Sequence, residues 1–430
     1  MKKEEFLSVL RERLDGSDMD ASQAREILED FNDHFNGAVR QGKDEESICE
    51  SLGDPSEIAA QFSDGKGRSG GQTQSQTPRV QSFSQPIASG VFDPARIKRV
   101  AVDLYACGLT IVTHDVDKII VEIKGKDANK FYVSEENGCV LIGEEKPSKW
   151  LYWLFQRFVE TEAVVYLPAT RDPRSNDRDY APDIEGTVRF GDIRIQAANA
   201  HIVNLKQNAG NFKIEGCRLK EMEIKSAAGN AEICDCAGEH FKIKCMAGNI
   251  ISKNSVGVLH LHSAAGNISA ENQNGNADIH SAAGNVDVTS LSGDVLAHSG
   301  AGGVTVSAVC GRIDISSGAG DVNVRTQQAD RLKSTSGAGN VFAHAEHVDG
   351  DVKVSSGAGD VKLELLGFSG DIEASSGIGN VRIALPAHTD ARISAKTSMG
   401  SVHNDIRSND NASQTVDAKA SMGDVHITAI

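Results

Sequence analysis

From about residue 190 to the end of the chain, apolar and polar residues alternate in short runs that restart after a glycine. The run SAAGNVDVTSLSGDV (281–295) shows the unit: a serine, two small residues, Gly, Asn and an apolar–polar–apolar triplet. Alternation with a period of two places every second side chain on the same side of a β-strand. The pattern therefore predicts many short strands separated by tight glycine corners.

The corner glycines recur at a nearly constant interval, which is 18–20 residues for most of this region. A second, weaker glycine turn lies about half a period later, so each repeat contains at least two strands and two corners. A period of this length is typical of coils that stack and bury their apolar sides against each other. The sequence predicts a mainly β protein, with a β-solenoid of about 13 coils over residues 183–430.

The corners have their own chemistry. Small residues permit a sharp bend, glycine adopts a positive φ at little cost, and the Asn or Asp that follows can hydrogen-bond to its equivalent one coil away. We interpret these positions as structural, because the nonapeptide pattern of calcium-binding β-helices is absent. Representative corner residues are Gly229, Asn230, Gly266, Asn267, Gly284, Asn285, Gly320 and Asp321.

Residues 1–62 have helical periodicity instead, with Phe6, Leu10 and Leu14 on one predicted face. The ending SLGDPSEIAAQF contains a helix-start signal, in which an aspartate caps the helix and a proline occupies its first position. This segment resembles the HAAS domain of bacterial signalling proteins, and the motif that carries the resemblance is Leu52, Gly53, Asp54 and Pro55. The resemblance implies a small all-α signalling or interaction module.

Residues 63–90 are rich in Gly, Ser, Gln and Pro and are expected to form a flexible linker. Residues 91–182 read as lead-in strands, including a hairpin at Asn137-Gly138. They are interrupted by SKWLYWLFQRFVE, whose aromatic residues either touch a membrane surface or cap the open end of the β stack. The aromatic residues concerned are Trp150, Trp153, Phe155 and Phe158.

The lead-in strands ending in VVYLPA, followed by units such as SGAGDVNV, resemble a bacterial adhesin-like β-strand-repeat family, a domain of unknown function. The resemblance extends over residues 95–430. It implies the repetitive β fold, whereas adhesion is suggested by analogy alone.

The chain carries a formal charge of −16, and residues 1–62 hold 16 acidic against 7 basic residues. No basic stripe is present that could neutralise phosphates, which argues against nucleic-acid binding. The first residues lack the apolar core of a secretion signal, and no apolar run is long enough to span a membrane as a helix. We expect a cytoplasmic protein, with membrane association through the aromatic segment as the alternative, and eight reduced cysteines.

No nucleophile, metal-binding or phosphate-binding motif is recognisable, so we expect no enzyme activity, cofactor or metal. His262, His280 and His298 should stack at one-coil spacing, as should Cys217 and Cys236. The expected function is binding or scaffolding, with an exported surface adhesin or a β-helix carbohydrate-active enzyme as alternatives. A protein partner would bind the helical head or a solenoid face. Because the sequence stops at Ile430 within or just after a strand, we also expect homo-oligomers to form through an uncapped C-terminal coil.

Overall fold

A computed structural model describes residues 2–15, 54–56, 88–125, 128–145, 161–169 and 181–430, with Leu28, Asn32, Phe35, Glu45 and Cys49. The chain divides into two compact units, and all of the described β-strands belong to the larger one. The aromatic residues singled out from the sequence (Trp150, Trp153, Phe155 and Phe158), together with Leu52 and Gly53, lie outside the described residues.

The smaller unit contains helix α1 (Lys3–Asp15), whose apolar residues Phe6, Leu10 and Leu14 are buried as the helical spacing predicts. The ring of Phe6 meets that of Phe35 edge-on at 5.5 Å between centroids. Farther along, the Asp54 carboxylate accepts a hydrogen bond of 2.7 Å from the backbone N–H of Ser56. This bond is the helix-capping interaction expected before Pro55.

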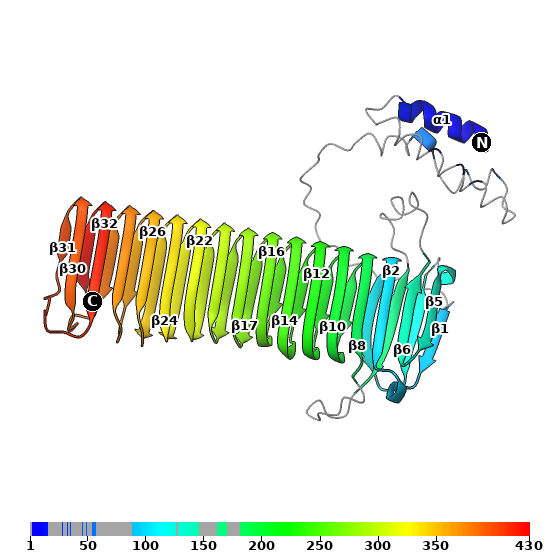
Figure 1. Cartoon of the computed structure of the whole chain (residues 1–430), viewed down its shortest axis with the longest axis horizontal. Coiled ribbons are helices and arrows are strands. Elements are labelled where there is room, and N and C mark those ends of the chain that lie inside the picture. Colours follow the sequence, from blue (N-terminus) through cyan, green and yellow to red (C-terminus); the bar gives the residue numbers. More distant parts are fainter. Residues whose placement is uncertain are drawn as a thin grey trace. The chain divides into compact units, whose positions relative to one another are not determined.

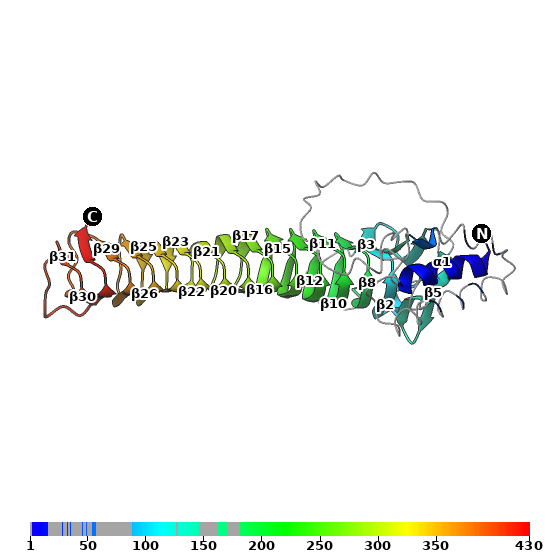
Figure 2. The same ribbon diagram turned by 90° about the horizontal axis from the view of Figure 1, so that it is seen from above.

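The larger unit is a β-solenoid built from two stacked rows of strands, which we call face 1 and face 2 (Figures 1 and 2). Face 1 contains, in spatial order, β5 (Phe131–Glu136), β6 (Cys139–Glu144), β2 (Arg99–Ala106), β8 (Asp183–Phe190), β10 (Asn199–Ala209), β12 (Arg218–Ala228), β14 (Ala237–Ala247), β16 (Val256–Ala265), β18 (Ala277–Ala283), β20 (Val295–Ala301), β22 (Arg312–Ala319), β24 (Arg331–Ala338), β26 (Val352–Ala358), β28 (Ile372–Ile378), β32 (Thr415–Met422) and β30 (Arg392–Met399). Face 2 contains β1 (Ala88–Phe92), β4 (Ile119–Lys124), β7 (Glu162–Pro168), β3 (Gly108–His114), β9 (Ile193–Gln196), β11 (Phe212–Glu215), β13 (Ala231–Cys234), β15 (Ile250–Lys253), β17 (Ile268–Asn274), β19 (Val286–Ser292), β21 (Val304–Cys310), β23 (Val322–Ala329), β25 (Val341–Val348), β27 (Val361–Leu365), β29 (Val381–Leu385), β33 (Val425–Ala429) and β31 (Val402–Asn404).

Each coil consists of one strand of face 1, a glycine corner, one strand of face 2 and a second corner. Residues 183–430 form thirteen such coils, which confirms the solenoid predicted from the glycine period. The two strands of a coil give the solenoid two faces, a number that the sequence had left open. The lead-in strands extend the same stack, because β2–β3 and β6–β7 form two further parallel coils.

The core is a single thin layer between the two faces. Val286, Val304 and Val322 stand in register on successive coils, and each is at most 1% exposed. Full burial of such a side chain contributes about 1.5–3 kcal/mol. Because each coil is covered only by its neighbours, the stability of the stack depends on coil-to-coil register.

At both ends of the stack, spatial order departs from chain order. At the start, β6–β7 lies outside β2–β3, and the antiparallel strands β5, β4 and β1 close the end. The β5–β6 pair is the hairpin predicted at Asn137-Gly138, and both turn residues have a positive φ.

At the other end, the last coil in sequence, β32–β33, is inserted between β28–β29 and β30–β31. The expectation that the C-terminal coil is uncapped is therefore wrong. The outermost coil is β30–β31, and the chain steps back from it by one coil before it ends. Both edges of the final strands are thus hydrogen-bonded, a placement that no local sequence signal reveals.

Among the helices of the described residues, none combines the length and the apolar character that a membrane crossing requires.

Candidate binding groove

Two rows of mainly polar side chains run along the outer surface of face 1, near the start of its strands. Strand alternation creates them, because the residue just before or at the strand start and the residue two positions later both point outward, while the one between is buried. The corner row consists of Asn276, Asp294, Arg312, Arg331, Asp351, Asp371 and Thr415. The strand row consists of His260, Asp278, Leu296, Asp314, Lys333, Lys353, Glu373 and Asp417.

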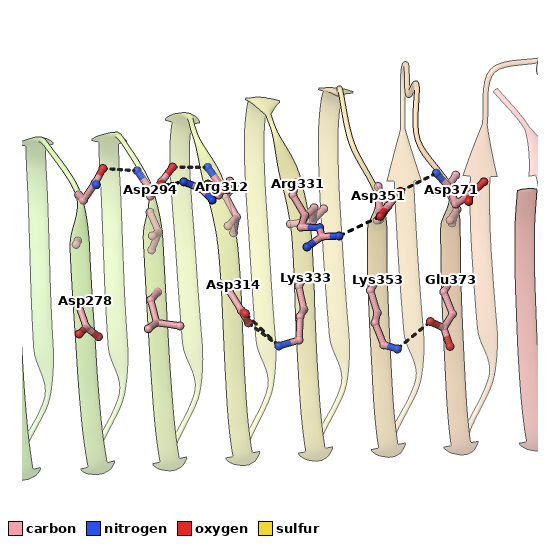
Figure 3. Close-up of a pocket in the computed structure, with 18 of the residues that line it drawn as sticks. Asp278, Asp294, Arg312, Asp314, Arg331, Lys333, Asp351, Lys353, Asp371 and Glu373 are labelled. Carbon is pink, nitrogen blue, oxygen red and sulfur yellow. Dashed lines mark hydrogen bonds and ion pairs between the residues drawn. The ribbon is translucent and has the colours of Figure 1, made fainter. Parts of the chain in front are cut away.

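Ion pairs connect neighbouring coils within each row (Figure 3). In the corner row, Arg312 reaches back to Asp294 at 3.1 Å and Arg331 reaches forward to Asp351 at 3.0 Å. The strand row repeats this arrangement, and its pairs are Asp314–Lys333 at 3.0 Å and Lys353–Glu373 at 2.8 Å.

The charges follow a definite order along the solenoid axis. The four cations occupy the central coils, and carboxylates lie beyond them on both sides. Exposed pairs of this kind contribute about 0–1 kcal/mol each, so they order the side chains more than they stabilise the fold. The outer surface thus carries an acidic, a basic and a second acidic block.

Between the two rows lies a groove with a volume of about 870 Å³. Its floor is made by the strand backbone above buried residues such as Ile313, Leu332 and Val352. It is lined by eight coils, from β16 to β32, which corresponds to a length of roughly 35 Å at the usual strand spacing. These dimensions suit an extended chain that lies along the solenoid axis.

One carboxylate of the groove is held by two hydrogen bonds. A hydrogen bond from Arg331 and one from the backbone N–H of Asp371 lower the pKa of Asp351, which keeps this carboxylate charged near neutral pH. Within the described residues, no three His, Cys, Asp or Glu side chains are arranged to hold a metal ion.

The corner residues singled out from sequence lie at the opposite end of the face 1 strands. There, the side-chain oxygen of Asn267 accepts a hydrogen bond from the backbone N–H of Asn285 at 2.8 Å. In the same way, Asn230 accepts a hydrogen bond of 2.9 Å from the backbone N–H of Asn249. Asp321 accepts one of 2.7 Å from the backbone N–H of Asn340. These side chains hold each coil to the next and face away from the groove. The corner glycines Gly229, Gly266, Gly284 and Gly320 all have positive φ.

The stacked histidines and cysteines do not line the groove. His262, His280 and His298 stand in register, with ring centroids 6.5 and 5.9 Å apart. Cys217 and Cys236 are both buried and both free thiols. The hydrogen bond with Cys217, reinforced by burial, raises the pKa of Cys236 far above its usual value.

The groove was not predicted from the sequence, because the apolar and corner positions that define the repeat do not include the residues that line it. A signal was nevertheless present. Charged residues recur two positions apart at the start of successive face 1 strands, as in Arg312/Asp314, Arg331/Lys333, Asp351/Lys353 and Asp371/Glu373.

Comparison with known proteins relates this chain to a family. No protein with a curated description matches the chain significantly. Two solved structures resemble it: a "putative cell adhesion protein" from Clostridium sporogenes ATCC 15579, with 8% identity over 80% of this chain and 98% of that one and a TM-score of 0.18, and a "putative adhesin" from Bacteroides fragilis NCTC 9343, with 11% identity over 79% and 96% and a TM-score of 0.24. The Toastrack DUF4097 family model matches residues 97–308 and 285–429, and the HAAS model matches residues 5–61. The chain therefore belongs to the Toastrack DUF4097 family and carries an N-terminal HAAS domain.

Proposed function

We propose that this protein is a non-catalytic binding scaffold whose face 1 groove holds an extended, charged segment of a partner protein. The observation that carries the proposal is the continuous groove across eight coils, with its walls made of ordered charged side chains. A partner segment would lie along the axis. It would place basic residues over the two acidic blocks and acidic residues over the central cations.

The ion pairs within the groove can be replaced by ion pairs with a bound ligand. Each cation is already oriented by a carboxylate on a neighbouring coil, as Lys333 is by Asp314 and Lys353 by Glu373. The pairs are half exposed, so replacing them with charges of a ligand costs about 1 kcal/mol or less for each pair. Charge complementarity of this kind contributes mainly specificity and a fast association rate.

The HAAS domain supplies a second attachment point on the same chain. We propose that it binds a separate signalling protein. Two binding modules on one chain raise the effective concentration of one partner near the other, which is how a scaffold acts without chemistry of its own.

Site-specific photo-crosslinking in the native cells tests the groove. A photoreactive amino acid at Leu296, which is 42% exposed in the strand row, should yield discrete protein adducts. The same group at Leu366, which is 54% exposed outside the groove, is the matched control.

The double variant K333E/K353E should abolish the adducts at Leu296, because it reverses two of the four cations and so removes the net positive charge of the basic block. Adducts that survive this double reversal, or that form equally well at Leu366, would exclude the groove as the binding surface.

A further inference from the structure

We infer that face 1 carries a second binding surface, a straight row of basic and polar side chains that holds a linear acidic polysaccharide along the solenoid axis. We call it the central row. It lies two residues beyond the strand row of the groove, and none of its members lines the groove. Its basic part consists of Lys206, Lys225, Lys244, His262, His280 and His298.

The register of the strands creates the central row. Each member faces outward because both of its neighbours in the strand are buried, as Leu205 and Gln207 are on either side of Lys206. Lys206, Lys225 and Lys244 are Cα partners on the successive parallel strands β10, β12 and β14 (Figure 1), so about 4.8 Å separates one backbone position from the next. Because 19 residues separate them along the chain, no basic run is visible in the sequence.

The protein does not neutralise the lysines of this row by itself. Glu223 pairs with both Lys225 and Lys242, at 3.0 Å each. Within the described residues, neither Lys206 nor Lys244 forms an ion pair with a carboxylate. Strands β10, β12 and β14 together contain six Lys or Arg and three Glu, an excess of positive charge in a chain whose net charge is −16. Like charges in register on neighbouring strands destabilise a sheet, and an anionic ligand would relieve that repulsion.

Uncharged hydrogen-bonding groups extend the row beyond the lysines. The Asp278 carboxylate lies 2.7 Å from Nε2 of His280, and Nδ1 of His298 lies 2.8 Å from the hydroxyl oxygen of Ser316. The row then continues through the hydroxyl groups of Ser316, Thr335, Ser355 and Ser375. Imidazole and hydroxyl groups both donate and accept hydrogen bonds, which suits the hydroxyl groups of a sugar, whereas lysine suits its carboxylate.

The spacing of the row favours a sugar chain among linear anions. Ten positions at one-coil spacing span roughly 43 Å. One sugar unit of an extended polysaccharide is close to one coil step in length, so a chain of uronic acids presents about one sugar to each coil. Acidic side chains on one side of an extended peptide are about 6.8 Å apart and would lose register with the coils. The row also contains no Arg, Phe, Tyr or Trp, with which proteins usually bind phosphates and stack bases.

The surface beside the basic part leaves room for such a chain. Two residues after each basic position the strand again presents an outward side chain, and this one is small in four coils: Ala227, Ala264, Ala282 and Gly300. The exception is Met246, which is 67% exposed and offers an apolar contact beside Lys244. A sugar ring can therefore approach the backbone while its charged group reaches the row.

Binding of a labelled ten-sugar oligogalacturonate to the full chain tests the inference, by fluorescence anisotropy in about 0.1 M salt. The wild type should bind this oligomer, and it should bind the methyl-esterified oligomer, which has the same length but no charge, at least tenfold more weakly. K206Q/K244Q should weaken binding of the acidic oligomer by about tenfold or more. A four-sugar oligomer should bind more weakly than the ten-sugar one, because it spans fewer coils.

Two control variants make the same change of charge elsewhere. K213Q/K253Q removes two exposed lysines from face 2, and K333Q/K353Q removes two from the groove. Both should leave the affinity for the oligomer unchanged.

Three results would each overturn the inference. The first is the absence of binding at oligomer concentrations up to about 1 mM. The second is an equal loss of affinity in K333Q/K353Q, which would place the anion in the groove. The third is equally tight binding of a polyglutamate with the same number of charges, which would identify an acidic peptide as the ligand.

Discussion

Gly302 lies directly over Gly284 of the neighbouring coil. A Cβ added at Gly302 would stand 2.4 Å from the carbonyl oxygen of Gly284, and the φ of Gly302 is +150°. Both the backbone conformation and the close approach of the coils exclude a side chain here. The adjacent Gly303 is different, because a Cβ added there would be 3.4 Å from its nearest neighbour, an ordinary contact.

Gly302→Ala should therefore destabilise the solenoid by roughly 2 kcal/mol or more, whereas Gly303→Ala should cost less than about 1 kcal/mol. Urea unfolding of both variants, monitored by circular dichroism, measures the midpoints that test this prediction. Equal midpoints for the two would show that the coil spacing at this corner adapts to a methyl group.

The Asn and Asp residues that follow the corner glycines should stabilise the protein through their side-chain acceptor oxygen. Asn267→Ala should destabilise the protein by about 1 kcal/mol, because the N–H of Asn285 loses its acceptor. Asn267→Asp should retain most of the stability, since aspartate occupies the equivalent position at Asp321 and there accepts the same bond. The same unfolding experiment measures both. If Asn267→Asp destabilised the protein as much as Asn267→Ala, the hydrogen-bonding role of this position would be contradicted.

Stability should decline in acid. Hydrogen bonds from the N–H of Asn380 and from Arg382 lower the pKa of Asp360 in the folded chain. A folded-state pKa below the unfolded one contributes stability that is present above about pH 4 and is lost as the pH falls through the folded value.

The unfolding midpoint of the wild type should fall as the pH is lowered from 6 to 2.5. The midpoint of the Asp360→Asn variant should fall less steeply over the same range. An identical slope in both proteins would remove Asp360 from the set of groups responsible.

The position of the last coil in sequence predicts an unusual pattern of hydrogen exchange. Strand β32 is paired on both sides, to β28 and β30, whereas β30 is an edge strand. Mass spectrometry should show slower amide exchange for Thr415–Met422 than for Arg392–Met399. Faster exchange at 415–422 would mean that the chain end does not hold its inserted position in solution.

The cysteines predict one reactive thiol. Cys310 is exposed, and six of the other seven cysteines are buried. Burial raises the pKa of Cys245 to about 11, and burial together with the nearby Glu232 raises that of Cys234 to the same value. A maleimide should label the folded protein rapidly at one site at neutral pH, and C310S should remove that site.

The same thiol tests where the protein resides. If the protein is cytoplasmic, a membrane-impermeant maleimide applied to intact cells should leave Cys310 unmodified until lysis. Labelling before lysis would instead favour the surface adhesin.

The sequence alone was sufficient to predict the repeated unit of this protein. Alternation of residues such as Val286, Asp287 and Val288 specifies a strand, and glycines 18–20 residues apart specify where each coil bends. Both are local rules, so they can be read without knowledge of the partners. The helix of residues 3–15 and the cap at Asp54 followed from equally local signals.

Only the tertiary structure decided the order in which coils stack. Every coil offers nearly the same edge, so local chemistry does not prevent β28 from pairing with β32 in place of β30. The groove has the same origin, because Asp314 and Lys333 become partners only when coils 19 residues apart are placed in register. Ile378, Met422 and Met399 lie on successive coils in space although Met399 precedes Met422 in the sequence, because long-range strand pairing places β32 between β28 and β30.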